Sequence, residues 1–82
     1  MIKKIYTVYD EKAEAYLQPF YFEKLGQAKR AVADLVNDPD HQFGKHPSDF
    51  TLFFIGDFDD SNAEIIPDKK PICNLIELKE AS

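Results

Sequence analysis

The chain has 82 residues, the length of one domain, so a single domain spanning residues 1–82 is expected. Its formal net charge of −5 argues against a protein that coats nucleic acid through its overall charge. The longest apolar run covers only residues 52–55, far less than a membrane span needs, so no membrane partner is expected.

Two extended segments open the chain. Residues 2–9 are rich in β-branched and aromatic side chains on both faces, which predicts a central strand or one covered by a partner. Residues 17–22 are also aromatic and extended, and Pro19 indicates a sheet edge or a bulge because proline has no N–H to donate. We expect these two segments to pair as a hairpin.

An α-helix is predicted over residues 25–36. Apolar residues at positions 25, 28, 32, 35 and 36 fall on one side of such a helix, and the charged residues between them fall away from it. The helix has to end by Asn37, because Asp38 precedes Pro39 and is disfavoured in the α region.

The second half of the chain predicts further strands. Residues 50–58 are typical of a strand, and a turn at 59–62 leads to a short strand at 63–66, so this pair predicts a second hairpin. Prolines bracket a short loop at 67–71, and residues 72–78 predict a last strand or, alternatively, a helix. The fold class that follows is α+β, with a small antiparallel sheet of about five strands and one helix packed on one face.

The connection 37–49 is dense in polar and ionisable side chains. His41 and His46 lie there among several aspartates, and imidazole with carboxylate is a legitimate set of metal ligands. The spacing matches no zinc pattern, so we expect no metal and a structural loop whose side chains cap turns. Gly44 is expected to supply an unusual φ. The alternative is that His41, Phe43 and His46 contact a ligand or a protein partner.

The eleven aromatic residues are too many for one small core. In a regular strand the neighbours Phe53 and Phe54 point to opposite faces of the sheet, so an aromatic face remains after the helix has covered the other one. Burial of that face in a homodimer is the favoured interpretation. The alternative is an exposed face on which unpaired bases stack.

Positive charge is concentrated near the start of the chain. Residues 1–33 carry six basic and four acidic side chains, a balance of +2, whereas residues 34–64 carry one basic and eight acidic side chains, a balance of −7. Single-stranded DNA is the expected nucleic-acid partner, because tyrosines offer stacking surfaces and no element resembles a groove-reading helix. The basic side chains predicted to contact it are Lys3, Lys4, Lys29 and Arg30.

Nothing in the sequence predicts catalysis. The glycines at 26, 44 and 56 are isolated, so there is no phosphate-binding loop, and no enzyme activity or cofactor is expected. The turn at 57–62 departs from a calcium loop at its sixth position, Asn62, and is expected to use Asp and Asn for positive φ. The single cysteine, Cys73, cannot form an internal disulfide and is expected to be a strand or core residue in a reducing cytosol.

Several motifs of the chain are similar to those of a known family. They are Ala15-Tyr16-Leu17-Gln18-Pro19-Phe20, Ala28-Lys29-Arg30-Ala31, an Asn-Asp-Pro-x-His-x-Phe-Gly-x-His-Pro loop at 37–47, and a Leu-Phe-x-x-Gly-x-Phe-Asp strand at 52–59. Over residues 3–66 the chain resembles the small nonstructural protein of gokushoviruses, the single-stranded DNA phages of the Microviridae. None of these motifs is a catalytic signature.

That resemblance implies a nonstructural viral protein of the infected host cytoplasm that binds DNA or shifts genome synthesis from the double-stranded replicative form to packaged single strands. The first hypothesis is a non-enzymatic, dimeric replication accessory protein that acts during single-strand synthesis and packaging. The alternative is an adaptor that engages a viral or host replication protein through its acidic segment 34–64 without touching DNA.

Overall fold

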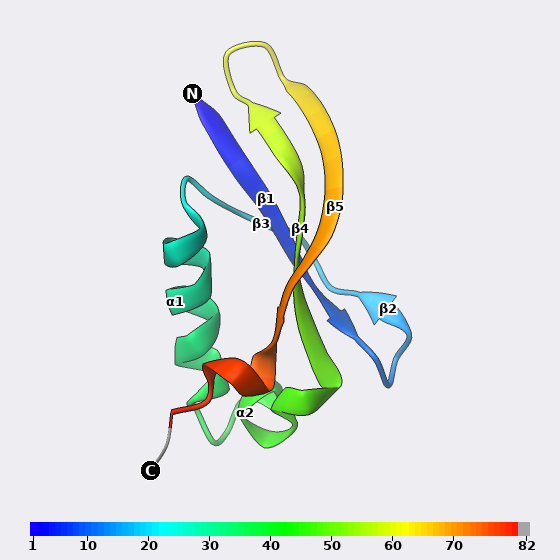
Figure 1. The fold of residues 1–82 in the computed structure, drawn as a ribbon, viewed down its shortest axis with the longest axis vertical. Helices are drawn as coiled ribbons and strands as arrows, with labels where there is room; N and C mark the ends of the chain where they lie inside the picture. Colours follow the sequence, from blue (N-terminus) through cyan, green and yellow to red (C-terminus); the bar gives the residue numbers. More distant parts are fainter. Residues whose placement is uncertain (81–82) are drawn as a thin grey trace.

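One antiparallel sheet forms the centre of the fold. A computed structural model of the chain describes residues 1–80 and contains five strands. β1 (Ile2–Asp10) is central. It pairs with β4 (Phe50–Asp59) on one side and with the two short strands β2 (Ala15–Tyr16) and β3 (Phe20–Phe22) on the other side. β5 (Glu64–Asn74) pairs with β4 as the outermost strand (Figure 1). The predicted α+β class and the central position of the first strand are confirmed.

The predicted first hairpin is present, but its second arm is interrupted. Of the strand expected at 17–22, only residues 20–22 (β3) are strand, and a two-residue strand, β2, precedes them at 15–16, with Leu17, Gln18 and Pro19 between the two. Pro19 has no N–H with which to continue the ladder to β1, and the chain loops out at this point. The Leu17 N–H still donates to the Val8 carbonyl at 2.8 Å, which keeps this loop against the sheet.

The helix α1 (Leu25–Val36) has the bounds that the sequence predicts. Its buried side chains Ala28, Val32 and Val36 join the core of the sheet. Leu35 belongs to the predicted apolar stripe but stays exposed. The buried core consists of Tyr6, Val8, Ala28, Val32, Val36, Phe43, Phe50, Leu52, Phe54 and Leu75.

The connection after α1 is more regular than the sequence predicts. It contains a short helix α2 (Gln42–Lys45) and a 3-10 turn η1 (Pro47–Asp49). Gly44 lies inside α2, where a side chain would overlap the carbonyl oxygen of Asp38. The prediction of an unusual φ at Gly44 is wrong, because the glycine is needed for this close approach of two backbone segments.

The largest difference between prediction and structure lies in the C-terminal third. Residues 67–71, expected as a loop, belong to the continuous strand β5, which also contains the first three residues of the strand predicted at 72–78. The rest of that segment is a 3-10 helix, η2 (Leu75–Leu78), in line with the helical alternative. Pro67 and Pro71 are tolerated because β5 is an edge strand whose ladder with β4 contains two register shifts. Asn74 ends the strand, and its side chain caps η2.

The turn between β4 and β5 also differs in detail from its prediction. The positive φ expected of Asp or Asn is found at Ala63, at 62°. Asp59 and Asn62 act through their side chains instead. Asp59 Oδ1 accepts hydrogen bonds from the hydroxyl and the N–H of Ser61, at 2.6 and 3.0 Å, and these bonds lower the pKa of the Asp59 carboxyl.

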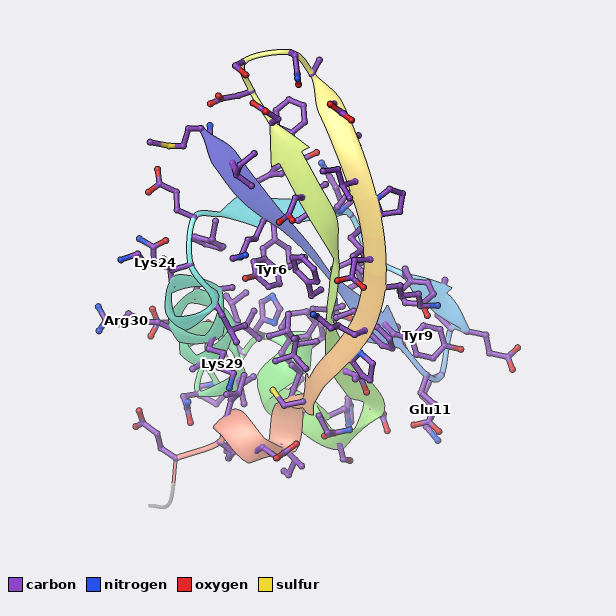
Figure 2. The ribbon with its side chains drawn as sticks, turned by 45° about the horizontal axis from the view of Figure 1, so that its top comes forward. Tyr6, Tyr9, Glu11, Lys24, Lys29 and Arg30 are labelled. Carbon is purple, nitrogen blue, oxygen red and sulfur yellow. The ribbon has the colours of Figure 1, made fainter. Side chains whose placement is uncertain are left out.

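Helix α1 covers only one face of the sheet (Figure 1). Side chains alternate along β1, so Tyr6 is directed toward α1 and Tyr9 lies on the opposite side (Figure 2). We call the face opposite α1 the open face. The ladders place on it Lys3, Ile5, Thr7, Tyr9, Tyr16, Tyr21, Thr51, Phe53, Phe58, Ile65, Pro67, Lys69 and Pro71.

Candidate nucleic-acid interface

The open face carries an aromatic cluster near the β1–β2 turn, here called the first cluster (Tyr9, Tyr16 and Phe53). Tyr9 and Tyr16 lie directly opposite each other in the β1–β2 pair, with ring centroids 4.7 Å apart. The Tyr16 and Phe53 centroids are 5.4 Å apart with nearly perpendicular rings, a favourable aromatic geometry. Tyr16 is 44% exposed, so the cluster presents ring surface to solvent.

The ammonium group of Lys69 lies over the first cluster. Its Nζ is 4.7 Å from the Tyr16 centroid and 5.5 Å from the Phe53 centroid, within the range of cation–π attraction. No carboxylate of residues 1–80 forms an ion pair with Lys69, whereas the other three lysines of the strands each have such a partner. The charge of Lys69 is therefore open to an external anion.

A second aromatic pair lies farther along the open face, toward the β4–β5 turn. Tyr21 and Phe58 lie on strands that flank β1 on its two sides, with ring centroids 6.2 Å apart. Tyr21 is 52% exposed, and Lys3 lies opposite Phe58 in the β1–β4 pair. The Lys3 ammonium is 3.9 Å from the Asp60 carboxylate, which partly neutralises it. The open face thus places an aromatic group beside a lysine twice along its length.

The structure does not bring the four predicted DNA contacts onto one surface. Lys3 lies on the open face, whereas Lys4 points to the α1 side and pairs with Asp57 at 3.8 Å. Lys29 and Arg30 belong to α1, in the other layer, and Arg30 is directed away from the sheet (Figure 2). Contact between these four side chains and DNA remains a prediction.

A cavity of about 210 Å³ lies on the α1 side of the sheet, between Lys4, Tyr6, Phe54 and Lys70. The Lys4 and Lys70 ammonium groups are 5.5 and 5.2 Å from the Phe54 centroid. Burial, with a smaller contribution from the Asp57 carboxylate, raises the pKa of the Tyr6 phenol. Both lysines already pair with carboxylates, so this cavity is less suited to an anion than the open face is.

The predicted partner-contact residues of the connection 37–49 differ in their exposure. His41 Nδ1 accepts a hydrogen bond from the Phe43 N–H at 3.0 Å and caps α2, which confirms the capping role predicted for this loop. Phe43 is buried with its ring centroid 4.8 Å from that of Phe50, so its side chain belongs to the core. His46 is exposed, and a partner contact through this loop remains a prediction.

We expect His41→Ala to lower the free energy of unfolding by about 1 kcal/mol, because the Phe43 N–H loses the group that caps it. His41→Asn is the matched control, since asparagine is a good cap at the same position and should retain most of the stability. Urea denaturation followed by circular dichroism measures both variants. Equal losses would show that His41 stabilises the chain by a route other than the cap.

The side chains of residues 1–80 do not form a metal centre, because no three His, Cys, Asp or Glu side chains gather closely enough to hold an ion. Cys73 packs against the core from β5, as predicted for a strand or core residue, and burial raises the pKa of its thiol. No helix in this part of the chain is both long enough and apolar enough to cross a membrane.

Fold and surface together describe a small α+β protein with an uncovered aromatic sheet face. A family model described as Phage ORF5 protein matches residues 3–80. The chain therefore belongs to the phage ORF5 protein family and is a phage protein. Neither a curated protein nor a solved structure matches it.

Proposed function

We propose that this phage protein binds single-stranded DNA through its open face and assists genome replication in the cytoplasm of the infected host cell. The resemblance of residues 3–66 to the nonstructural proteins of gokushoviruses, in the Microviridae, supports a role in the switch from double-stranded replication to single-strand synthesis and packaging. The proposed role is non-enzymatic, because the protein holds the strand and makes or breaks no bond in it.

The observation that carries this proposal is the pairing of exposed aromatic rings with an unpaired lysine on the open face. Every base has a flat π surface, so aromatic side chains on a sheet can bind single strands with little regard to sequence. Each stack of this kind is worth about 1–3 kcal/mol. The position of the Lys69 ammonium beside Tyr16 supports the proposal, because it would let Lys69 pair with the phosphate of a stacked nucleotide.

The acidic composition limits how DNA can be held. Lys3 and Lys69 are the lysines of the open face, so we expect it to neutralise about two phosphates. For single strands the logarithm of the binding constant falls with log salt by about 0.7 per neutralised phosphate, which gives a slope of about 1.4 here. Binding by stacking more than by charge is compatible with a net charge of −5.

Fluorescence anisotropy with a labelled oligo-dT tests the proposal. The double variant Tyr16→Ala, Lys69→Gln is expected to weaken binding by about tenfold or more, because it removes one stacking ring and the unpaired ammonium. Lys45→Gln makes the same change of charge at an exposed position on α2 and should bind nearly as well as the wild type. Circular dichroism confirms that each variant is folded.

Two results would contradict binding through the open face. Loss of binding in Lys29→Gln, Arg30→Gln, with the open-face variant unaffected, would support the contacts predicted on α1. Absence of binding at low salt in the wild type would reject direct DNA contact and favour the adaptor for a viral or host replication protein. For that adaptor, the acidic residues of 34–64 offer two separate surfaces, one around α2 and one at the β4–β5 turn (Figure 1).

We also propose that self-association, where it occurs, uses the open face. A second copy that covers the two aromatic groups would bury the rings that a DNA strand needs, at about 25 cal/mol per Å² of apolar surface. DNA and a homodimer would then compete for one surface. Light scattering with and without oligo-dT measures this: a dimer that dissociates as DNA binds supports the competition, and one that persists has its interface elsewhere.

A further inference from the structure

The open face contains a cavity of about 290 Å³ beside the first cluster. Thr7 lies at its floor and is buried, and the exposed ring of Tyr16 forms one wall. The remaining lining residues are Leu17, Pro19, Ile55 and Lys69. The cavity is therefore apolar on most sides, with one ammonium group among its lining residues.

Two irregularities of the sheet create this hollow on either side of β1. On one side, Leu17, Gln18 and Pro19 lie opposite only two residues of β1, because β2 and β3 are separated there. On the other side, the β1–β4 register shifts between Ile5 and Tyr6, and Ile55 is the extra residue of β4. A regular sheet would be closed at this point, so the cavity is a product of both interruptions.

The chemistry of the lining selects a flat ligand that carries a negative charge. The Thr7 hydroxyl donates to the Leu17 carbonyl at 2.7 Å, so its hydrogen is already used while its oxygen can still accept. The ring of Tyr16 offers a stacking wall. The Lys69 ammonium lies 4.7 Å from the centroid of that ring and has no carboxylate partner within residues 1–80.

We propose that this cavity receives one unpaired base of the bound strand, which takes the place of the Lys69 ammonium over the Tyr16 ring while that ammonium turns to the adjoining phosphate. This inference rests on the proposed function and adds to it a fixed point at which the strand is held. Small-molecule sites have volumes of about 300–1,000 Å³, and a cavity of about 290 Å³, just below that range, suits a ligand as small as a single base.

Of the three cavities on the α1 side, the smallest also has lysines beside an aromatic ring, and it lacks two of these properties. Its volume is about 210 Å³, and both of its lysines are already paired with carboxylates. The cavity of the open face is larger, has an unpaired ammonium and adjoins further rings on which neighbouring bases can stack. Two larger cavities, of about 620 and 380 Å³, also adjoin α1, but within residues 1–80 neither has an ammonium group over an aromatic ring. The combination of exposed rings and an ammonium without a carboxylate partner, and not volume, assigns the base to the open face.

The test combines a change in the protein with a change in the DNA. A labelled oligo-dT is first shortened to the minimum length that retains affinity. At that length the strand cannot slide along the protein without losing contacts. An abasic site is then placed at each position of the oligonucleotide in turn. In wild-type protein we expect one position to cost about tenfold or more in affinity and the others to cost much less. Ile55→Phe fills the cavity without changing charge and should weaken binding of the intact strand by a similar factor.

The decisive result is the coupling between the two changes. If the base occupies the cavity, the abasic strand and the Ile55→Phe variant each remove the same contact, so their combined loss is little greater than either loss alone. Ile65→Phe, an exposed position elsewhere on the open face, is the matched control and should leave the sensitive abasic position unchanged. If Ile55→Phe fails to fold, Tyr16→Leu replaces it, since Tyr16 is half-exposed and its loss should also abolish the position-specific penalty.

The outcomes separate the cavity from the proposed function. Wild-type binding that depends on Tyr16 and Lys69 but shows no sensitive abasic position, or additive losses, overturns the base-binding cavity and leaves single-strand binding in place. Absence of any oligo-dT binding overturns both.

Discussion

Gly44→Ala is expected to lower the free energy of unfolding by about 3 kcal/mol. The methyl group would overlap the carbonyl oxygen of Asp38 and approach that of Val36, and both obstacles are backbone atoms that cannot turn aside as a side chain can. Relief would require α2 to move away from the end of α1. Because Phe43 is anchored in the core next to Gly44, that movement would also disturb the core.

Gly26→Ala is the matched control for this substitution. Gly26 is also helical, but no heavy atom lies within 4 Å of the position a side chain would take, so alanine should stabilise α1 by about 0.5–1 kcal/mol. Urea denaturation of the two variants measures the difference. A small loss for Gly44→Ala would mean that α2 can shift freely and that the close backbone approach is not required.

Leu75→Ala should cost about 2–5 kcal/mol, the range found when a buried leucine is cut back to alanine. Leu75 is fully buried at the start of η2 and belongs to the same core cluster as the side chains of α1. The total stability of a domain this size is about 5–15 kcal/mol, so this single change would remove a large share of it. Thermal and urea unfolding both measure the loss.

Ile76→Ala tests the same element from its exposed side. Ile76 is 48% exposed, so its truncation should change stability by less than about 0.5 kcal/mol. Neighbouring side chains of a strand also alternate between buried and exposed. A large cost for Leu75→Ala and a small one for Ile76→Ala therefore tests the burial observed in η2, and does not by itself distinguish the helix from a strand. Equal losses in the free energy of unfolding for Leu75→Ala and Ile76→Ala would show that the C-terminal segment does not pack as the structure describes it.

The sequence predicts α1 to the residue because two independent signals agree. The apolar spacing defines its buried side, and Asp38 before Pro39 defines where it stops. The strand β5 is mispredicted because its prolines are typical of a loop as well as of a sheet edge. Which strand lies at the edge depends on the whole sheet, and no local pattern contains that information.

The start of η2 did leave a signal in the sequence. Asn74 and Glu77 have the spacing of a capping box, in which Glu77 Oε2 accepts from the Asn74 N–H at 3.0 Å and Asn74 Oδ1 accepts from the Ile76 N–H at 2.9 Å. This pair favours the helix, the alternative to a last strand, whereas the β-branched residues nearby favour the strand.

The candidate site was only partly predictable for a related reason. The surplus of aromatic residues does predict a second aromatic face, and alternation predicts that either Phe53 or Phe54 lies on it. The register that brings Tyr16, Phe53 and Lys69 together involves four strands, and it depends on two bulges in the β4–β5 ladder. With 67–71 predicted as a loop, Lys69 has no assigned face, so the lysine most open to a phosphate is overlooked.

Pro67 and Pro71 help to protect the exposed edge of the sheet, strand β5, against pairing with another chain. An edge strand with free N–H groups is a template on which another chain can add, and repeated addition leads to fibres. Proline has no N–H, so β5 carries two fewer backbone donors at Pro67 and Pro71, and the charged side chains of Lys69 and Lys70 lie between them. This edge should therefore have little tendency to nucleate aggregates.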